Sequence, residues 1–401
     1  MLHSHIIQAA TPSILTQWRL QKCSSLLQHQ SSKHGDNLIG RRFQRRVRRP
    51  TQVCRASQPL MRDNISDGQE WGTWLFPFSA PLSPAPKRKT LRTEVIPSQV
   101  WTFDQLIGAV SVNVNIRMTV IALSSGVLWA YAPIAPTEEC VRLVKELEAI
   151  HGNLAYIVLP TYAVEHKQYL GAFSRSFPDA EVWVAPYQWS FPLNLPISWL
   201  GLFPREARVL PEDGGALPWA GELQHATLGP IELGLGPFVE VAFFHAPSGT
   251  LLLTDSLVGI SAEAPDICMD SPEGLLYHAR RDASEPIEDT PSFRSKGWAK
   301  TVLFALFVAP RQVELVSPAA AIRDWAQSPA FPAPDSFFPF RWSTDDWEES
   351  FAAVRQTFFV PPLLRVFIFN RGPDQVLGWV SELKQWNFTR VIPAHFDAID
   401  A

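Results

Sequence analysis

The chain contains little cysteine and no long apolar run. It has four cysteines in 401 residues, and no two of them form a Cys-x-x-Cys pair, which excludes a disulfide framework and a zinc ribbon. The apolar stretch TVLFALFVA, residues 301–309, is much shorter than the roughly 18 residues that a membrane-spanning helix needs. We therefore expect no membrane span. Hydrophobic residues still make up 46% of the chain, which is enough for a substantial globular core.

The motifs of several enzyme classes are missing as well. No Gly-x-Ser-x-Gly, P-loop or Gly-x-Gly-x-x-Gly motif stands between a predicted strand and a predicted helix. Serine hydrolysis and nucleotide chemistry therefore have no support in this sequence.

Acidic residues are almost absent from residues 1–56. This segment has ten Lys or Arg, six serines and one acid, Asp36, whereas the rest of the chain has 25 basic and 38 acidic residues. The composition is typical of an organelle transit peptide, and VCRAS at residues 53–57 suits cleavage near Ala56. The alternative is a disordered basic arm that binds nucleic acid. Because the acidic remainder offers no basic face to share such binding, we expect no nucleic-acid partner.

The segment at residues 57–95 is rich in proline and serine and predicts a linker, with order beginning near Trp101. Residues 117–134, RMTVIALSSGVLWAYAPI, then predict a β-hairpin. A helix should follow between the N-cap Thr137 and a stop at Gly152.

The next segment, YIVLPTYAVEHKQYLG at residues 156–171, runs from an apolar strand into a polar loop. We expect a strand over 154–160, a helix over 167–177 and another strand over 181–186. Such a series predicts a parallel pair whose loop lies at the carboxyl ends of the strands, where α/β proteins place their functional groups.

The second half of the chain predicts another hairpin, FVEVAFFH and TLLLTD around APSG, with Asp255 at its end. Residues 265–360 predict a mostly helical insertion. After it, LRVFIFN at residues 364–370 predicts a strand, residues 373–386 a helix, and FTRVIPAHF at residues 388–396 a strand that ends at His395.

Three predicted strand ends thus carry metal-competent side chains: Glu165 with His166, Asp255, and His395. In this order the sequence resembles the metallo-β-lactamase superfamily. The resemblance implies an α/β protein, an αββα sandwich in which two mixed sheets pack face to face with helices outside. It also implies one metal position made of these four residues, for a divalent zinc, iron or manganese ion.

The departures from the superfamily pattern are specific. Thr161 and Ala163 stand where its motif has two histidines, and residues 237–240 lack its lone histidine. The second metal position of that superfamily is therefore abolished here. The remaining position can also be empty, because Glu165 replaces an aspartate and each of the four residues alone has an ordinary structural explanation: a helix first turn, a turn former or a structural histidine.

A closer resemblance covers about residues 95–400. Segments such as NIRMTVIALSSGVLWAYAPIAPTEEC and NRGPDQVLGWVSELKQWNFTRVIPAHFDAI resemble the plant and algal branch of an uncharacterised family, domain of unknown function 4336. This resemblance implies that residues 1–56 are a plastid transit peptide, that the protein resides in the chloroplast stroma, and that residues 96–401 form the folded domain. Relatives continue past the end of this chain, so we expect the edge near His395 to be exposed.

Two functional hypotheses follow. In the first, the protein is a non-catalytic binding or assembly factor whose partner is a plastid protein or a small molecule. The loss of half of the superfamily's metal site favours this hypothesis. In the second, it is a single-metal-dependent hydrolase in which Glu165 acts as the general base. His245, on the strand before Asp255, is expected to be structural or to support the site from outside.

Overall fold

The computed structural model describes residues 89–400, apart from 110–111, 190–193, 195, 200–205, 235, 308–311, 329–336 and 344–345. The predicted transit peptide and most of the predicted linker lie outside the described residues. The end of that linker prediction is wrong, because Leu91–Ile96 forms strand β1, which pairs antiparallel with β2. Its mixed polar and apolar composition carries no strand signal, and the pairing with β2 is what makes it a strand.

The first sheet has seven strands in sequence order: β1, β2 (Val100–Ala109), β3 (Val112–Leu123), β4 (Val127–Tyr131), β5 (Leu154–Leu159), β6 (Glu181–Val184) and β7 (Arg208–Val209). Strands β1 to β4 are antiparallel neighbours, whereas β4 to β7 run parallel. The predicted hairpin β3–β4 and the predicted parallel pair β5–β6 are both confirmed.

The second sheet has the order β16 (Ile399–Asp400), β15 (Arg390–Pro393), β10 (Thr250–Leu253), β9 (Pro237–His245) and β8 (Leu223–Glu232). Strands β9 and β10 form the predicted hairpin, and β15 runs parallel to β10. This parallel pairing brings the ends of β10 and β15 to the same edge of the sheet, with Asp255 and His395 just beyond them.

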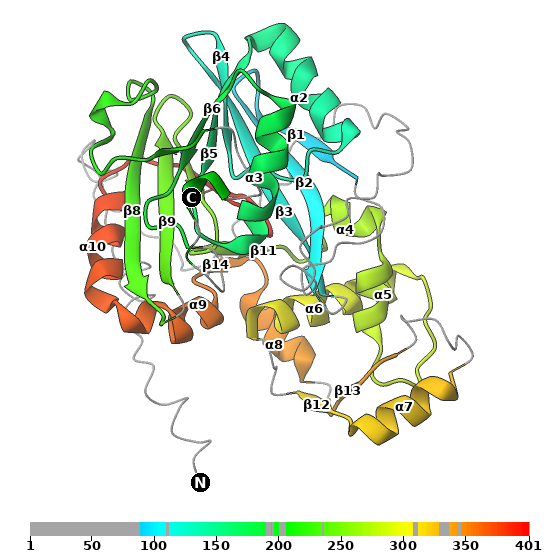
Figure 1. Cartoon of the computed structure of the whole chain (residues 1–401). Helices are drawn as coiled ribbons and strands as arrows, with labels where there is room; N and C mark the ends of the chain where they lie inside the picture. The colour runs from blue at the N-terminus through cyan, green and yellow to red at the C-terminus, as the bar shows by residue number, and fades with distance from the viewer. Residues whose placement is uncertain are drawn as a thin grey trace, which may run out of the picture. The chain divides into compact units, whose positions relative to one another are not determined.

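The two sheets pack face to face (Figure 1). The apolar layer between them contains Trp129 and Tyr131 of β4, and Val241 and Phe243 of β9. The Tyr131 hydroxyl donates to the Val241 carbonyl oxygen at 3.1 Å, so the layer also contains a direct hydrogen bond between the sheets.

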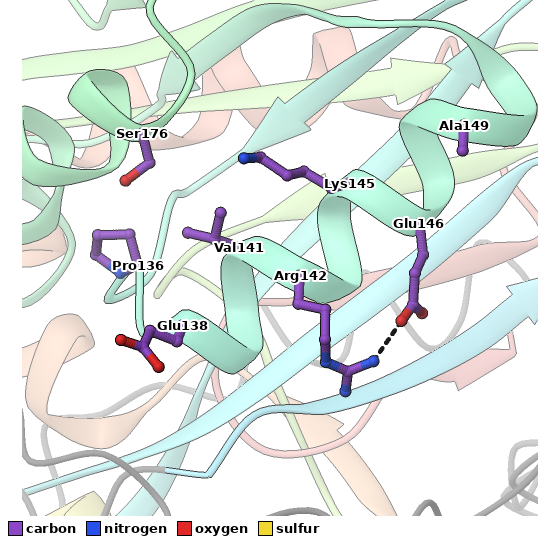
Figure 2. Close-up of a pocket in the computed structure, with 8 residues that line it drawn as sticks. All are labelled: Pro136, Glu138, Val141, Arg142, Lys145, Glu146, Ala149 and Ser176. Atoms are coloured by element: carbon purple, nitrogen blue, oxygen red, sulfur yellow. Dashed lines mark hydrogen bonds and ion pairs between the residues drawn. The ribbon is translucent and has the colours of Figure 1, made fainter.

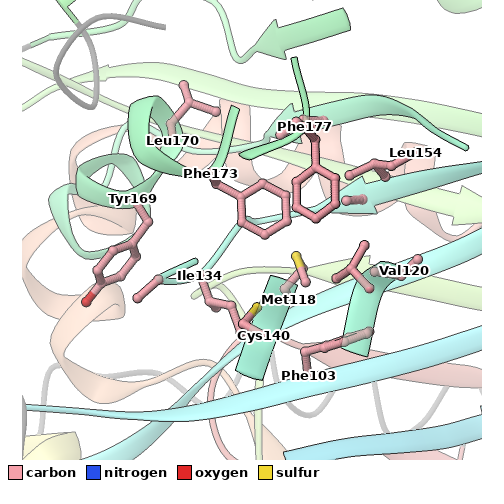
Figure 3. Packing of buried hydrophobic residues seen from close by; sticks show 14 of the residues in the cluster. Phe103, Met118, Val120, Ile134, Cys140, Leu154, Tyr169, Leu170, Phe173 and Phe177 are labelled. Carbon is pink, nitrogen blue, oxygen red and sulfur yellow. The ribbon is translucent and has the colours of Figure 1, made fainter. Parts of the chain in front are cut away.

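Helices cover the outer faces of both sheets. Helix α2 (Glu138–His151) begins after its N-cap Thr137 and ends at Gly152, as predicted, and α3 (Val164–Ser176) packs beside it on the first sheet. Figure 3 shows Tyr169 and Phe173 of α3 in the same buried layer as Met118 of β3. On the second sheet, α10 (Pro373–Leu383) packs against β8, and the Trp379 indole donates to the Ala226 carbonyl oxygen at 3.1 Å. The predicted αββα sandwich is confirmed by this layer order.

The segment between β11 (Val258–Ile260) and β14 (Thr357–Phe359) contains most of the remaining helices. They are α4 (Asp266–Asp270), α5 (Glu273–Ala279), α6 (Pro291–Phe307), α7 (Pro318–Ala326) and α8 (Trp347–Val354), with the two-stranded sheet β12 (Val313–Leu315) and β13 (Phe340–Trp342). Its core centres on α6, where Trp298 is fully buried. No helix among the residues described here is long and apolar enough to cross a membrane.

Two predicted elements differ in the structure. The strand predicted over 364–370 is helix α9 (Pro362–Phe367) followed by the 3-10 helix η5 (Phe369–Arg371). Pro362 at the first helical position favours the helix. In addition, β10 already pairs with β9 and β15, so residues 364–370 cannot pair with β10 as a strand. Two other short 3-10 helices in the described part of the chain are η2 (Ile197–Trp199) and η3 (Gly214–Ala216).

The second difference concerns the start of α3, which begins at Val164 and not near Lys167 as predicted. The N-cap residue Ala163 makes no side-chain cap hydrogen bond, so the usual sequence signal for a helix start is missing. Glu165 and His166 therefore lie in the first turn of the helix.

Candidate metal centre

The first turn of α3 and two bends at one edge of the sandwich bring His166, Asp255 and His395 together. One ligand atom from each lies within 4.8 Å of the other two. The His395 Nε2 atom is 3.4 Å from Asp255 Oδ1, and the ring centroids of His166 and His395 are 5.2 Å apart. The residues come from α3, from the bend after β10 and from the bend after β15, which lie far apart in the sequence. The predicted meeting of these three side chains is thus present.

The His166 side chain is completely buried, and neither of its ring nitrogens has a hydrogen-bond partner among the described residues. Burial, with the nearby His395, holds its pKa well below the usual range, so the ring is neutral. An imidazole that is neutral, buried and without a hydrogen bond retains a lone pair for a metal, and such unsatisfied groups are rare in folded proteins. This is the observation by which the residues present fit a metal ion.

The orientation of His395 is set by β3. Its Nδ1 atom lies 2.8 Å from the carbonyl oxygen of Asn115, which can only accept a hydrogen bond. The Asn115 side chain in turn binds the backbone nitrogen and carbonyl oxygen of Phe396, at 2.7 and 3.0 Å. Arg117 also holds this bend, because its backbone nitrogen donates to the Ala394 carbonyl oxygen at 2.8 Å. His395 therefore presents Nε2 to the site.

Asp255 supplies the carboxylate. Burial raises its pKa well above the usual range, and the carboxylates of Glu165 and Glu240 raise it further. A site with this much negative charge favours a cation. The side chains of Asp255 and His395 are 15% and 13% exposed, so a substrate or water can reach their side of the site, although the edge is less exposed than the sequence led us to expect.

Glu165, the fourth predicted ligand, lies outside this three-residue group. It is half-buried in the first turn of α3, and its charge acts on Asp255 and His395. Adjacent residues on a helix point about 100° apart, so Glu165 and His166 cannot both face the same point squarely. Glu165 thus neighbours the group without belonging to it.

Thr161 and Glu240, which stand where the sequence departs from the superfamily pattern, are paired with other protein groups. Thr161 forms a β-bridge with Glu240, which is buried on β9. The Glu240 carboxylate accepts hydrogen bonds from Thr254 and Ser256, the two neighbours of Asp255. Glu240 was not predicted as a site residue, although an acid in the middle of the apolar strand FVEVAFF is a signal of a special role.

His245 does not join the three-residue group. Its Nδ1 atom lies 2.6 Å from Ser248 Oγ in the β9–β10 turn, and its Nε2 atom lies 3.8 Å from Glu222 Oε2. These contacts hold the turn, in line with the structural role predicted for it.

A surface groove of about 670 Å³ lies away from this centre, along α2 (Figure 2). It is lined by Pro136, Glu138, Val141, Arg142, Lys145, Glu146, Ala149 and Ser176, and Arg142 pairs with Glu146 inside it. Its lining mixes opposite charges on an exposed helix face and includes none of the predicted site residues.

Several solved structures resemble the chain at low identity. They include the Flv1 flavodiiron core from Synechocystis sp. PCC6803 (11% identical, 79% of this chain and 58% of that chain covered, TM-score 0.37) and a flavoprotein from Thermotoga maritima (8%, 78% and 57%, 0.39). The metallo-β-lactamase FIM-1 from Pseudomonas aeruginosa, in its mono-zinc form, is 13% identical (41% and 67% covered, TM-score 0.30). The chain thus spans less than two thirds of the flavodiiron core, and scores this low say nothing about function.

Comparison with curated proteins gave no match. A family model, in contrast, matches residues 97–401, nearly the whole of the described part of the chain and all three residues of the candidate centre. The chain belongs to the family described as Domain of unknown function (DUF4336).

Proposed function

We propose that the protein binds one divalent metal ion through His166, Asp255 and His395 and uses it to hydrolyse a small molecule. The observation that carries this proposal is the buried His166 ring, whose two nitrogens have no hydrogen-bond partner within the described residues. Two imidazoles and one carboxylate suit zinc, iron or manganese. Three protein ligands with an open side are typical of catalytic sites, whereas structural zinc sites are closed by four.

The contact between His395 and Asp255 gives independent support. Because the Asn115 carbonyl oxygen requires a proton on Nδ1 of His395, the neutral ring has only a lone pair on Nε2. That lone pair faces a carboxylate oxygen at 3.4 Å. Two acceptors in this position repel each other unless a cation or a proton lies between them.

The chain's own residues supply the rest of the chemistry. A bound divalent ion would polarise a substrate oxygen or make a water molecule more acidic. Glu165, beside the centre and partly exposed, is placed to accept the proton of an attacking water molecule. The Asn115 carbonyl keeps His395 in one tautomer and orientation.

A non-catalytic role is the second candidate, because Thr161 and Ala163 stand in place of two histidines of the superfamily motif. In that role the metal would stabilise a binding or assembly factor of the plastid stroma. The plastid location itself rests on the composition of residues 1–56 and on the family resemblance, and import of the full chain fused to a fluorescent protein would test it.

Elemental analysis of the purified full-length protein tests metal binding. We expect about one equivalent of zinc, iron or manganese in the wild type and far less in His166→Ala and His395→Ala. His151→Ala, which changes a histidine on α2 away from the centre, should retain the wild-type content. Equal metal content in all four proteins would refute the site.

Turnover then separates the two roles. A panel of phosphoesters, thioesters and lactones is assayed with the wild type and with Glu165→Gln. A hydrolase should lose activity by roughly a hundredfold or more in Glu165→Gln while its metal content is unchanged. A metal-loaded wild type that turns over none of these substrates would favour the binding factor.

A further inference from the structure

The Glu240 carboxylate has three hydrogen-bond donors, all from the bend that contains Asp255. Its Oε1 atom accepts from the Thr254 backbone nitrogen at 2.7 Å and from Ser256 Oγ at 2.9 Å. Its Oε2 atom accepts from the Ser256 backbone nitrogen at 3.0 Å. Glu240 is fully buried, so these bonds form where water does not compete.

The bend needs such support. Strand β10 ends at Leu253, and residues 254–256 are bends outside the sheet ladder. The Thr254 carbonyl oxygen accepts from the Ala394 nitrogen at 3.3 Å, a long hydrogen bond. The two backbone N–H groups that Glu240 binds lie immediately before and after Asp255. Fixing both neighbours fixes the direction in which the Asp255 side chain leaves the backbone.

We propose that Glu240 is a positioning residue that holds the Asp255 carboxylate in place for the metal ion. Three hydrogen bonds orient the bend before any ion arrives, so binding costs less ordering of the chain. Glu240 lies outside the group of side chains whose ligand atoms meet, so its carboxylate serves the bend. This inference rests on the proposed function, because it concerns the same metal centre.

Replacing Glu240 with glutamine tests this role. Glu240→Gln keeps the size of the side chain but leaves one carboxamide oxygen for donors that now bind two oxygens, and it turns an NH2 group toward an N–H donor. We expect zinc affinity, measured in the full chain by competition with a chromophoric chelator, to fall roughly tenfold or more. Ser256→Ala, which removes one of the three donors, should lower the affinity only a fewfold.

A merely structural Glu240 would lower thermal stability and leave the metal site unchanged. The visible absorption spectrum of the cobalt-loaded protein separates the two cases, because it reports the ligand geometry of the ion. We expect altered band positions in Glu240→Gln and the wild-type spectrum in Glu232→Gln, which changes an exposed acid on the neighbouring strand β8. Wild-type zinc affinity and cobalt spectrum in folded Glu240→Gln would overturn the proposal, and so would unchanged values in Ser256→Ala if Glu240→Gln does not fold.

A wild type that binds neither zinc nor cobalt would refute the proposed function but would leave the positioning of the bend to be tested in the metal-free protein. Amide hydrogen exchange then gives the answer. We expect the backbone amides of residues 254 and 256 to exchange at least tenfold faster in Glu240→Gln, and a fewfold faster in Ser256→Ala, than in the wild type. Equal protection in all three proteins would overturn the positioning role.

Discussion

The side-chain oxygen of Asn115 lies 2.7 Å from the backbone nitrogen of Phe396, the residue that follows His395. Asn115 is fully buried, and its amide nitrogen donates both to the Phe396 carbonyl oxygen and to Asp104. The bend that presents His395 to the candidate centre is therefore attached to β3 through one side chain. The contact joins residues that are separated by 281 positions in the sequence.

Asn115→Ala should detach this bend. We expect the free energy of unfolding to fall by about 2 kcal/mol, because buried backbone groups of Phe396 lose their partners. Metal affinity should fall as well, since His395 is then less well oriented. Denaturant unfolding and zinc titration measure both effects. Asn153→Ala, an exposed position between α2 and β5, is the matched control and should change neither.

Metal binding should stabilise the fold, because the centre joins three separate parts of the chain. Zinc at a free concentration one hundred times its Kd should add about 2.7 kcal/mol to the free energy of unfolding. Thermal unfolding with added zinc, and again after chelation, measures this gain. The gain should vanish in His166→Ala, and a wild-type midpoint that does not respond to zinc or to chelation would contradict the prediction.

Metal affinity should rise with pH because of Asp255. Burial lowers the pKa of His166 and His395, so both rings are already neutral near pH 7. Burial and neighbouring acids raise the pKa of Asp255, so the competing proton sits on this carboxyl group, where it can bridge to Nε2 of His395. An incoming cation displaces that proton. Calorimetry of zinc binding in buffers of different ionisation enthalpy should therefore detect release of about one proton per ion.

The released proton should disappear in Asp255→Asn, which cannot carry it, along with much of the affinity. If the wild type instead released no proton near pH 7, Asp255 would be ionised in the metal-free protein. A shared proton would then not explain why Asp255 Oδ1 lies 3.4 Å from His395 Nε2.

The stability of the fold should rise above about pH 8 because of Lys167. Burial lowers its pKa from 10.5 to about 8, against the opposing effect of Glu165. Between these pH values the unfolded chain binds a proton that the folded protein does not, so stability from this group rises as the pH increases from about 8 toward 10.5. Below pH 8 both states are protonated, and the buried charge lowers stability by a constant amount.

Lys167→Met should remove this rise in stability with pH. It should also raise the free energy of unfolding at pH 7 by about 2 kcal/mol, a figure that already includes the loss of the hydrogen bond to the Trp189 carbonyl oxygen. Denaturant unfolding at pH 7, 8, 9 and 10 measures both effects. Lys145→Met, at an exposed position on α2, should leave the pH profile unchanged. A less stable Lys167→Met at pH 7 would show that the hydrogen bond outweighs the buried charge.

Sequence patterns located most elements of the sandwich where the signal is local. Thr137 and Gly152 bound α2 through capping interactions within a few residues, and the APSG turn joins two apolar runs as a hairpin. The same reasoning failed for residues 364–370, an apolar run that is helix α9 and that leaves Phe367 60% exposed. A short apolar run is compatible with a helix or with a strand. Which one forms depends on whether the sheet has a free neighbouring strand with which the run can pair.

The candidate centre, too, was predicted only in part from the sequence. The order of Glu165, His166, Asp255 and His395 along the chain, each near the end of a strand, was visible in the sequence and sufficient to predict that a group of ligands meets. That Glu165 stands beside the group, that Glu240 holds the bend of Asp255, and that Asn115 selects the His395 tautomer were decided by the tertiary structure. Local chemistry determines which residue types follow a strand, but distances and hydrogen-bond partners between β3, α3, β9, β10 and β15 exist only after the two sheets have packed.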